Sequence, residues 1–226
     1  MQNTAQEPML QTPASPAGHT QPKRATRPAS PALEKLFELH PNLFGAHFLP
    51  LKLGIFHDLL ARHPDAFQKD ELKLAMGQHA RSTRYLECVA AGLERHDLDG
   101  TAVEPVSPEH IHHAILEVFR RRQARSKDDL RPRLRLLLKQ AIEKSGLVLD
   151  DYAALVRVQD EATNTLLDDA MAELKAEAAK REALMTTFKA SGKTEAEFAD
   201  MYGMNLKLVT SVLARVHAEE ATKPIS

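Results

Sequence analysis

Residues 50–60, PLKLGIFHDLL, carry the clearest signal of how this chain folds. After Pro50 their apolar side chains recur at helical spacing, which predicts a helix that ends near residues 63–64, His-Pro. The same spacing predicts helices from about residue 31 and over 65–79, and Ser82 is a suitable N-cap for the next one. With only 9 glycines and abundant Ala, Leu, Glu, Lys and Arg, the chain is expected to be mainly α.

One short β-element interrupts this helical pattern. The segment RHDLDG at 95–100 contains an Asp-Gly pair between apolar residues, which is a strong hairpin signal. Ser107 and Pro108 then occupy the favoured N-cap and first positions of a long helix. We therefore expect helices with one small β-hairpin among them in this part of the chain.

Composition divides the rest of the chain. At 226 residues it has room for one well-buried core and a smaller unit. Residues 1–30 are rich in proline and poor in large apolar side chains, so we expect a disordered tail. Residues 127–149 are expected to form a basic helical connector, and 150–220 an acidic helical region. Residues 140–226 hold 10 basic against 15 acidic residues, so this part carries a charge of −5.

The acidic region has a pattern of its own. Residues 150–189 contain neither glycine nor proline and predict one long helix with an incomplete apolar stripe. The two helices expected at 194–217 place Ala199, Gly203 and Val209 at offsets seen in helix-turn-helix units. We expect this pair to fold back on the long helix; packing against a second copy of the protein is the alternative. A DNA-binding regulator and a helical assembly protein are the alternative functions.

Several classes of function find no support in the sequence. A single cysteine excludes an internal disulfide framework, and no His or Asp set converges on a metal ion. There is no phosphate-binding glycine-rich loop or nucleophile motif, so we expect neither an enzyme nor a cofactor. No apolar stretch is long enough to span a membrane, and the N-terminus lacks a signal-peptide core. We therefore expect a cytoplasmic protein without membrane contact.

Three separated blocks resemble the ProQ/FinO family of bacterial RNA-binding proteins. They are PLKLGIFHDL at 50–59, RYL at 84–86 and RHDLDG at 95–100, in the family's order and nearly at its spacing. The resemblance covers about residues 31–125 and implies a compact, mostly helical RNA-binding domain with one small β-hairpin at residues 31–126. It implies an RNA chaperone that binds structured RNA, typically terminator-type 3′ ends with a stem and a U-rich tail. Such a protein would act on small RNAs and mRNA 3′ ends, affecting small-RNA stability or pairing in post-transcriptional regulation.

The resemblance also assigns candidate residues. Tyr85 and Arg95 match the pocket for the tail, with Lys52 nearby, and Lys69 and Lys73 match the stem-binding helix. Arg84 lies beside the tyrosine, and Arg81 is a further candidate for the stem. Two positions depart from the family pattern: Gly77 stands where the basic helix face usually continues, and His79 where relatives often have an aromatic residue.

Each assignment has a structural alternative. Lys69 and Lys73 share one helix face and suit phosphate contacts, but they could equally form a solvated charged surface. Tyr85 could be a platform for a base or a packed ring with its hydroxyl turned outward. The basic run at 120–139, which begins with Arg120, Arg121 and Arg122, could add RNA contacts or simply form a charged helix end. The acidic C-terminal helices are expected to repel phosphate and could mediate self-association.

Overall fold

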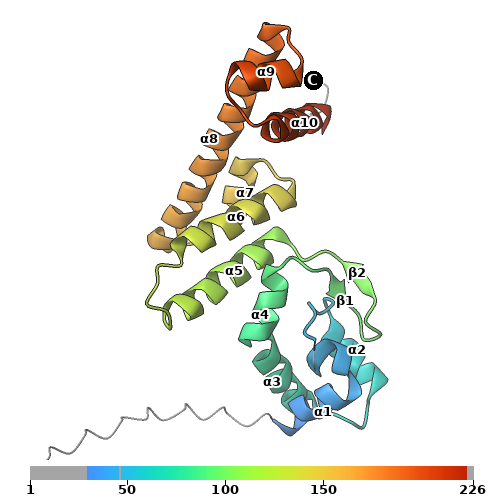
Figure 1. Ribbon diagram of the computed structural model, residues 1–226. Helices are drawn as coiled ribbons and strands as arrows, with labels where there is room; N and C mark the ends of the chain where they lie inside the picture. The colour runs from blue at the N-terminus through green and yellow to red at the C-terminus, as the bar shows by residue number, and fades with distance from the viewer. Residues whose placement is uncertain (1–29, 46, 223–226) are drawn as a thin grey trace, which may run out of the picture.

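The computed structural model describes residues 30–45 and 47–222, with side chains to residue 218. The disordered tail expected at 1–30 therefore lies outside the described residues, apart from Ser30. The described part is mainly α, with one two-stranded antiparallel sheet (Figure 1). Its elements are α1 (Pro31–Leu39), a π-helical turn η1 (Pro41–Gly45), α2 (Ile55–Arg62), α3 (Lys69–Ala80), α4 (Thr83–Ala90), β1 (Arg95–His96), β2 (Ala102–Glu104), α5 (Pro108–Gln123), α6 (Arg131–Ser145), α7 (Leu149–Val156), α8 (Glu161–Ser191), α9 (Glu195–Met201) and α10 (Leu206–Thr222).

Helices α1 to α5 and the hairpin surround one hydrophobic core. Leu36, Phe44, Leu59 and Leu72 are fully buried in it, and α4 packs along α5. The Ser82 side chain accepts a hydrogen bond from the Tyr85 N–H, which confirms the expected N-cap of α4. The hairpin and the Ser-Pro start of α5 are confirmed as well.

The helix that we expected from Pro50 begins five residues later. Residues 50–52 are extended beside the hairpin: the His96 N–H donates to Pro50 C=O at 2.7 Å, and the Lys52 N–H donates to His96 C=O at 2.9 Å. Gly54 then turns the chain into α2 with a φ of +80°, which favours glycine. The apolar spacing could not show this, because Leu51 and Ile55 are buried on the same side in either conformation.

Helix α6 occupies the segment expected to be a basic connector. Its Leu134 and Leu138 pack against Ile115 and Leu116 of α5, in a second cluster that also includes Ala170 of α8. The basic segment is therefore part of a packed layer between α5 and α8.

The prediction of one long helix over 150–189 is wrong: the chain forms two helices, α7 and α8, with a break at 157–160. Tertiary contacts explain the break. Tyr152 of α7 is fully buried, and its hydroxyl lies 3.2 Å from Nδ1 of His112 on α5. The Asn164 side chain replaces missing helical bonds by accepting from the Val158 N–H and donating to the Val158 C=O. A helix without glycine or proline is thus interrupted by its neighbours.

The last two helices fold back on α8, as the apolar pattern predicts. Phe198, Val209 and Leu213 pack against Met185 and its neighbours on the far end of α8, which stands out from the rest of the molecule (Figure 1). In the helix-turn-helix-like pair, Ala199 and Val209 are buried and Gly203 has a φ of +62°. Among the described helices, none combines the length and the hydropathy that a membrane span requires.

Candidate functional site

A row of positive charge follows the exposed side of α3. Lys69 and Lys73 are exposed, and neither side chain has a hydrogen bond or ion pair to the described residues. Four residues of helix rise by ~6 Å, so the two ammonium groups lie side by side along the helix. Asp70 and Glu71 lie in the first turn, where carboxylates favour the start of the helix. The row is therefore built from residues that α3 itself orients.

Arg81 extends this row back over Gly77. A Cβ atom at residue 77 would lie 3.1 Å from one terminal guanidinium nitrogen of Arg81 and 3.3 Å from the other. The missing side chain thus leaves the space in which the guanidinium rests. The basic face, which the sequence appeared to interrupt at this position, carries the charge of Arg81 instead.

Tyr85 and Arg95 meet at the backbone of Leu51. The Tyr85 hydroxyl accepts a hydrogen bond from the Leu51 N–H at 3.1 Å, and one Arg95 guanidinium nitrogen donates to the Leu51 C=O at 2.9 Å. Tyr85 is only 9% exposed and Arg95 8%. Burial raises the pKa of the Tyr85 hydroxyl, although the bond to Leu51 opposes this. Both side chains therefore hold α4 and the hairpin to the extended segment, and an RNA contact by them stays a prediction.

Lys52 lies at the edge of the same segment. Its Nζ donates to Asp58 at 2.8 Å, and this hydrogen bond raises the pKa of the lysine. The other guanidinium nitrogen of Arg95 lies 3.0 Å from Nδ1 of His110. The three residues assigned to a tail pocket are thus brought to one region, but each already has a partner within the protein.

A stack of rings leads from this buried region to the surface. The Tyr85 ring lies 5.0 Å from that of His79, which lies 4.6 Å from that of Phe48, and the Arg84 guanidinium sits over Phe48 at 4.5 Å. His79 is 2% exposed, and its burial lowers its pKa to about 4. The imidazole is therefore neutral near pH 7 and packs as an aromatic ring, which accounts for the departure at this position.

The three arginines at the end of α5 are engaged within the protein. Arg120 and Arg121 pair with Glu117 at 3.3 and 2.8 Å, and Arg122 pairs with Glu87 at 2.7 Å. Arg121 also donates to the Arg81 C=O and to the Thr83 hydroxyl. These bonds join α5 to the turn between α3 and α4. Arg121 therefore holds in place the end of α3, where the row of charge ends.

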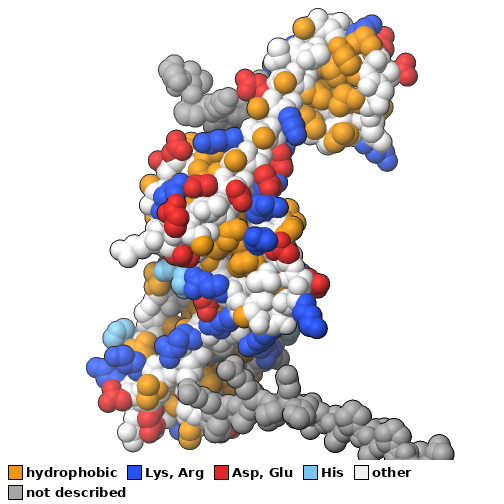
Figure 2. All heavy atoms as spheres, turned by 90° about the vertical axis from the view of Figure 1, so that its left-hand side faces the viewer, with side chains coloured by type: hydrophobic (Ala, Val, Ile, Leu, Met, Phe, Trp, Pro, Cys, Tyr) orange, Lys and Arg blue, Asp and Glu red, His pale blue; other side chains and the backbone are white. Residues whose placement is uncertain are grey.

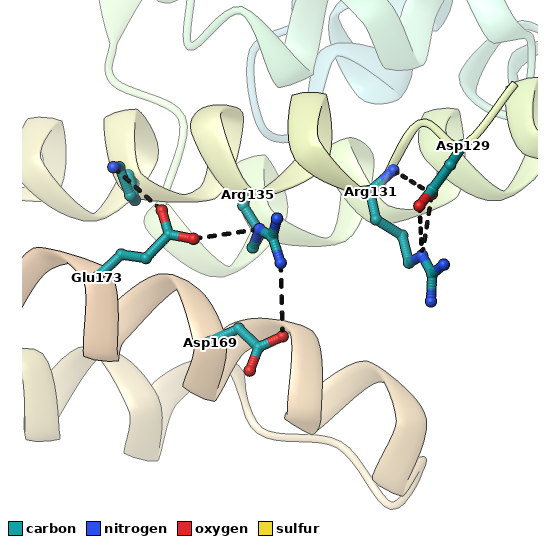
Figure 3. A network of polar contacts seen from close by, with 6 residues as sticks. Asp129, Arg131, Arg135, Asp169 and Glu173 are labelled. Atoms are coloured by element: carbon teal, nitrogen blue, oxygen red, sulfur yellow. Dashed lines mark hydrogen bonds and ion pairs between the residues drawn. The ribbon is translucent and has the colours of Figure 1, made fainter.

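Acidic residues of α8 cover part of α6. Arg135 lies 3.2 Å from Glu173 and 3.9 Å from Asp169 (Figure 3). Lys139 contacts Glu173 and Glu177. Asp169, Glu173 and Glu177 are spaced at four residues and form one stripe. In the same view Arg131 turns to Asp129. Much of the basic run is therefore neutralised inside the molecule.

Three exposed cations of the run are left without an ion-pair partner among the described residues, at the α5–α6 corner. Arg125, Lys127 and Arg133 have no side-chain hydrogen bond or ion pair to any residue in the described ranges. Figure 2 shows Lys and Arg side chains spread over the lower and middle parts of one face, with Asp and Glu interspersed higher up. The sequence indicated the run as a whole, but it could not separate paired from unpaired cations because the partners are distant in the chain.

No group of three or more His, Cys, Asp or Glu side chains within 30–45 and 47–222 is arranged to hold a metal ion.

Comparison with known proteins relates the N-terminal half of the chain to one protein family. Residues 26–131 match the ProQ/FINO family. The RNA chaperones ProQ of Shewanella pealeana and Idiomarina loihiensis are 43% and 36% identical over 86 and 99 residues. These matches cover 36% and 42% of this chain but only 41% and 47% of the relatives, so the chain spans less than half their length.

Two solved structures are each similar to part of this chain. A ProQ homolog from Legionella pneumophila is 31% identical, with a TM-score of 0.35. The match covers 50% of this chain and 99% of the homolog. A FinO-like RNA chaperone from Neisseria meningitidis is 29% identical, with a TM-score of 0.34. This match covers 36% of this chain and 84% of the chaperone.

Proposed function

Because the chain belongs to the ProQ/FinO family through residues 26–131, we propose that it is an RNA chaperone that binds structured RNA and catalyses no reaction. The curated relatives are named RNA chaperones, which supports this function for the shared domain. The observation that carries the proposal here is the row of unpaired cations on α3, with Lys69, Lys73 and Arg81 facing solvent.

Such a row suits the backbone of an RNA stem. Phosphates are contacted without reading the base sequence, and each neutralised phosphate releases condensed counterions. Lys69 and Lys73 are available for this role because no carboxylate of the described chain holds them. Arg121 fixes the position of the α3–α4 turn and thereby supports the row.

The finer proposal concerns which RNA is bound. We infer terminator-type 3′ ends, with the stem along α3 and the unpaired U-rich tail toward α4 and the hairpin. Binding of small RNAs and mRNA 3′ ends would then affect small-RNA stability or pairing. The family resemblance of residues 50–59, 84–86 and 95–100 supports this reading, and the exposed Arg84 at the start of α4 supplies a planar cation beside the row.

The acidic C-terminal helices suit a different role. The Lys and Arg residues of α10 are Lys207 and Arg215, and Arg215 pairs with Glu143, so little of this helix offers positive charge to a DNA duplex. Exposed apolar side chains at Met201, Tyr202 and Leu206 mark where self-association would occur. We favour a division in which residues 140–226 do not bind RNA.

Binding assays at stated salt test the proposed function. A hairpin RNA with a 3′ U tail should bind more tightly than duplex DNA of equal length. The double variant Lys69→Gln/Lys73→Gln should weaken RNA binding and reduce the magnitude of the salt slope by up to ~1.4 to 1.8, about 0.7 to 0.9 for each phosphate that these lysines neutralise. A matched control, Lys175→Gln/Lys180→Gln, neutralises two exposed lysines of α8. Equal effects of the two double variants would contradict a site on α3.

A further inference from the structure

The stack that ends at Arg84 presents a planar cation to solvent. Phe48 is half-buried, with its ring packed 4.6 Å from His79 below and the Arg84 guanidinium 4.5 Å above. His79 is in turn packed against Tyr85 and Phe44 in the core. The guanidinium therefore rests on a ring that is itself packed against the core, while Arg84 is exposed.

A groove opens beside this platform. It is shallow and open to solvent, has a volume of about 730 Å³ and is lined in part by Asn42, Phe48, Arg84 and Glu87. That volume lies within the range of about 300 to 1,000 Å³ that is usual for small-ligand sites. The Asn42 amide can both donate and accept hydrogen bonds, and Glu87 retains acceptor positions beside its contact with Arg122. The lining therefore combines a planar surface with groups that suit the edge of a base.

We propose that an unpaired base of the bound RNA stacks on the outer face of the Arg84 guanidinium, with its edge toward Asn42 and Glu87. Unpaired RNA bases are commonly held on aromatic rings or arginine planes and by hydrogen bonds at their edges. Arg84 follows Arg81 by three residues, so the groove lies close to the end of the row on α3, where a strand leaving a stem would be expected. The inference rests on the proposed RNA binding and names the subsite for the single strand.

The platform differs from the one that the sequence indicated. Tyr85 is the buried base of the stack, where its ring is covered by His79 and its hydroxyl is bound to Leu51. Arg84 is the layer that a ligand can reach. Phe48, which no sequence motif singled out, is the residue that orients it.

The test distinguishes the effect of the planar shape of the Arg84 guanidinium on RNA binding from the effect of its charge. Arg84→Lys keeps the charge but loses the plane, because a lysine ammonium is a point charge. Binding is measured for a hairpin with a 3′ single-stranded tail carrying 2-aminopurine and for the same hairpin without a tail. We expect Arg84→Lys to weaken binding of the tailed RNA about fivefold or more, the low end for losing one base stack, and to leave the blunt hairpin nearly unchanged. The 2-aminopurine fluorescence should be quenched by the wild type and recover in the variant.

Two further variants complete the design. Phe48→Leu removes the ring beneath the guanidinium and should reproduce the loss for the tailed RNA; its thermal unfolding is measured alongside to confirm folding. Arg157→Lys, at the exposed end of α7, is the matched control and should change neither RNA. If Arg84→Lys and Phe48→Leu weaken both RNAs equally or neither RNA, the base platform is wrong while RNA binding stands. If the wild type binds neither RNA, the proposed function fails and the platform fails with it.

Discussion

Tyr85 and Leu51 are joined by a buried hydrogen bond: the backbone N–H of Leu51 donates to the tyrosine hydroxyl at 3.1 Å. Arg95 satisfies the C=O of the same residue. Both polar groups of one backbone unit are therefore held by side chains that lie 34 and 44 residues away. Residues that a family resemblance assigns to RNA also hold this part of the fold together.

Tyr85→Phe should destabilise the protein by about 1 to 3 kcal/mol. The substitution keeps the ring that packs on His79 but leaves the buried N–H of Leu51 without an acceptor. Urea denaturation monitored by circular dichroism measures the free energy of unfolding. An unchanged unfolding midpoint would show that water or another group satisfies Leu51.

Gly77→Gln should raise stability and lower RNA affinity. Glutamine favours the interior of a helix over glycine by about 0.5 to 1 kcal/mol. Its side chain would displace the Arg81 guanidinium, which now rests within 3.3 Å of where a Cβ would lie. Thermal unfolding and RNA titration measure the two effects. In an Arg81→Ala background the same substitution should leave RNA affinity unchanged, and a loss of equal size there would contradict the role of Arg81.

The cations of the basic run that lack an ion-pair partner among the described residues should contribute more to RNA binding than the paired ones. A triple variant with Gln in place of Arg125, Lys127 and Arg133 should show a weaker salt dependence of RNA affinity. The magnitude of the slope of log affinity against log salt should fall by about 0.7 to 0.9 for each phosphate that is no longer neutralised. Replacing Arg120, Arg121 and Arg122 should flatten it less, because these arginines already pair with Glu117 and Glu87. Salt titrations of the two triple variants compare the slopes, and a larger change in the second set would reverse this assignment.

Stability should fall between pH 6.5 and about pH 4. Burial lowers the pKa of His79 and of His112 to about 4, whereas the ordinary value is 6.5. In this interval the unfolded chain binds more protons than the folded one, so stability is lost as the pH falls. Each histidine should contribute about 2 kcal/mol of loss between pH 7 and pH 5. His79→Phe should remove the contribution of His79 to this loss, which is measured as the free energy of unfolding across the pH range. A pH dependence as large as that of the wild type would contradict a lowered pKa of His79.

A fragment that ends before α6 should fold, but with reduced stability. We expect residues 31–126 to form the RNA-binding unit, although Ile115 and Leu116 of α5 are covered by Leu134 and Leu138. Exposing these two side chains should cost about 3 kcal/mol relative to a fragment of residues 31–147. Thermal unfolding of both fragments measures this difference. Equal stability would place the domain boundary before α6.

Much of the local structure follows from short-range rules. The Ser82 cap, the Ser-Pro start of α5 and the Asp-Gly turn each depend on residues within a few positions of one another, so the sequence predicts them. The start of α2 and the break between α7 and α8 do not follow in this way. They depend on Leu51 pairing with His96 and on Tyr152 packing against His112, contacts that span 40 residues or more.

The same distinction holds for the site. From the sequence alone, Lys69 and Lys73 share one face of a helix, because helical spacing places residues four apart together. Whether a cation is available was decided by the tertiary structure: Arg135 and Arg122 meet carboxylates of distant segments, and Lys73 meets none among the described residues. Residue type and spacing determine where charge can lie. Packing between distant elements determines which charges are neutralised and which planar groups, such as Arg84 on Phe48, reach the surface in a fixed orientation.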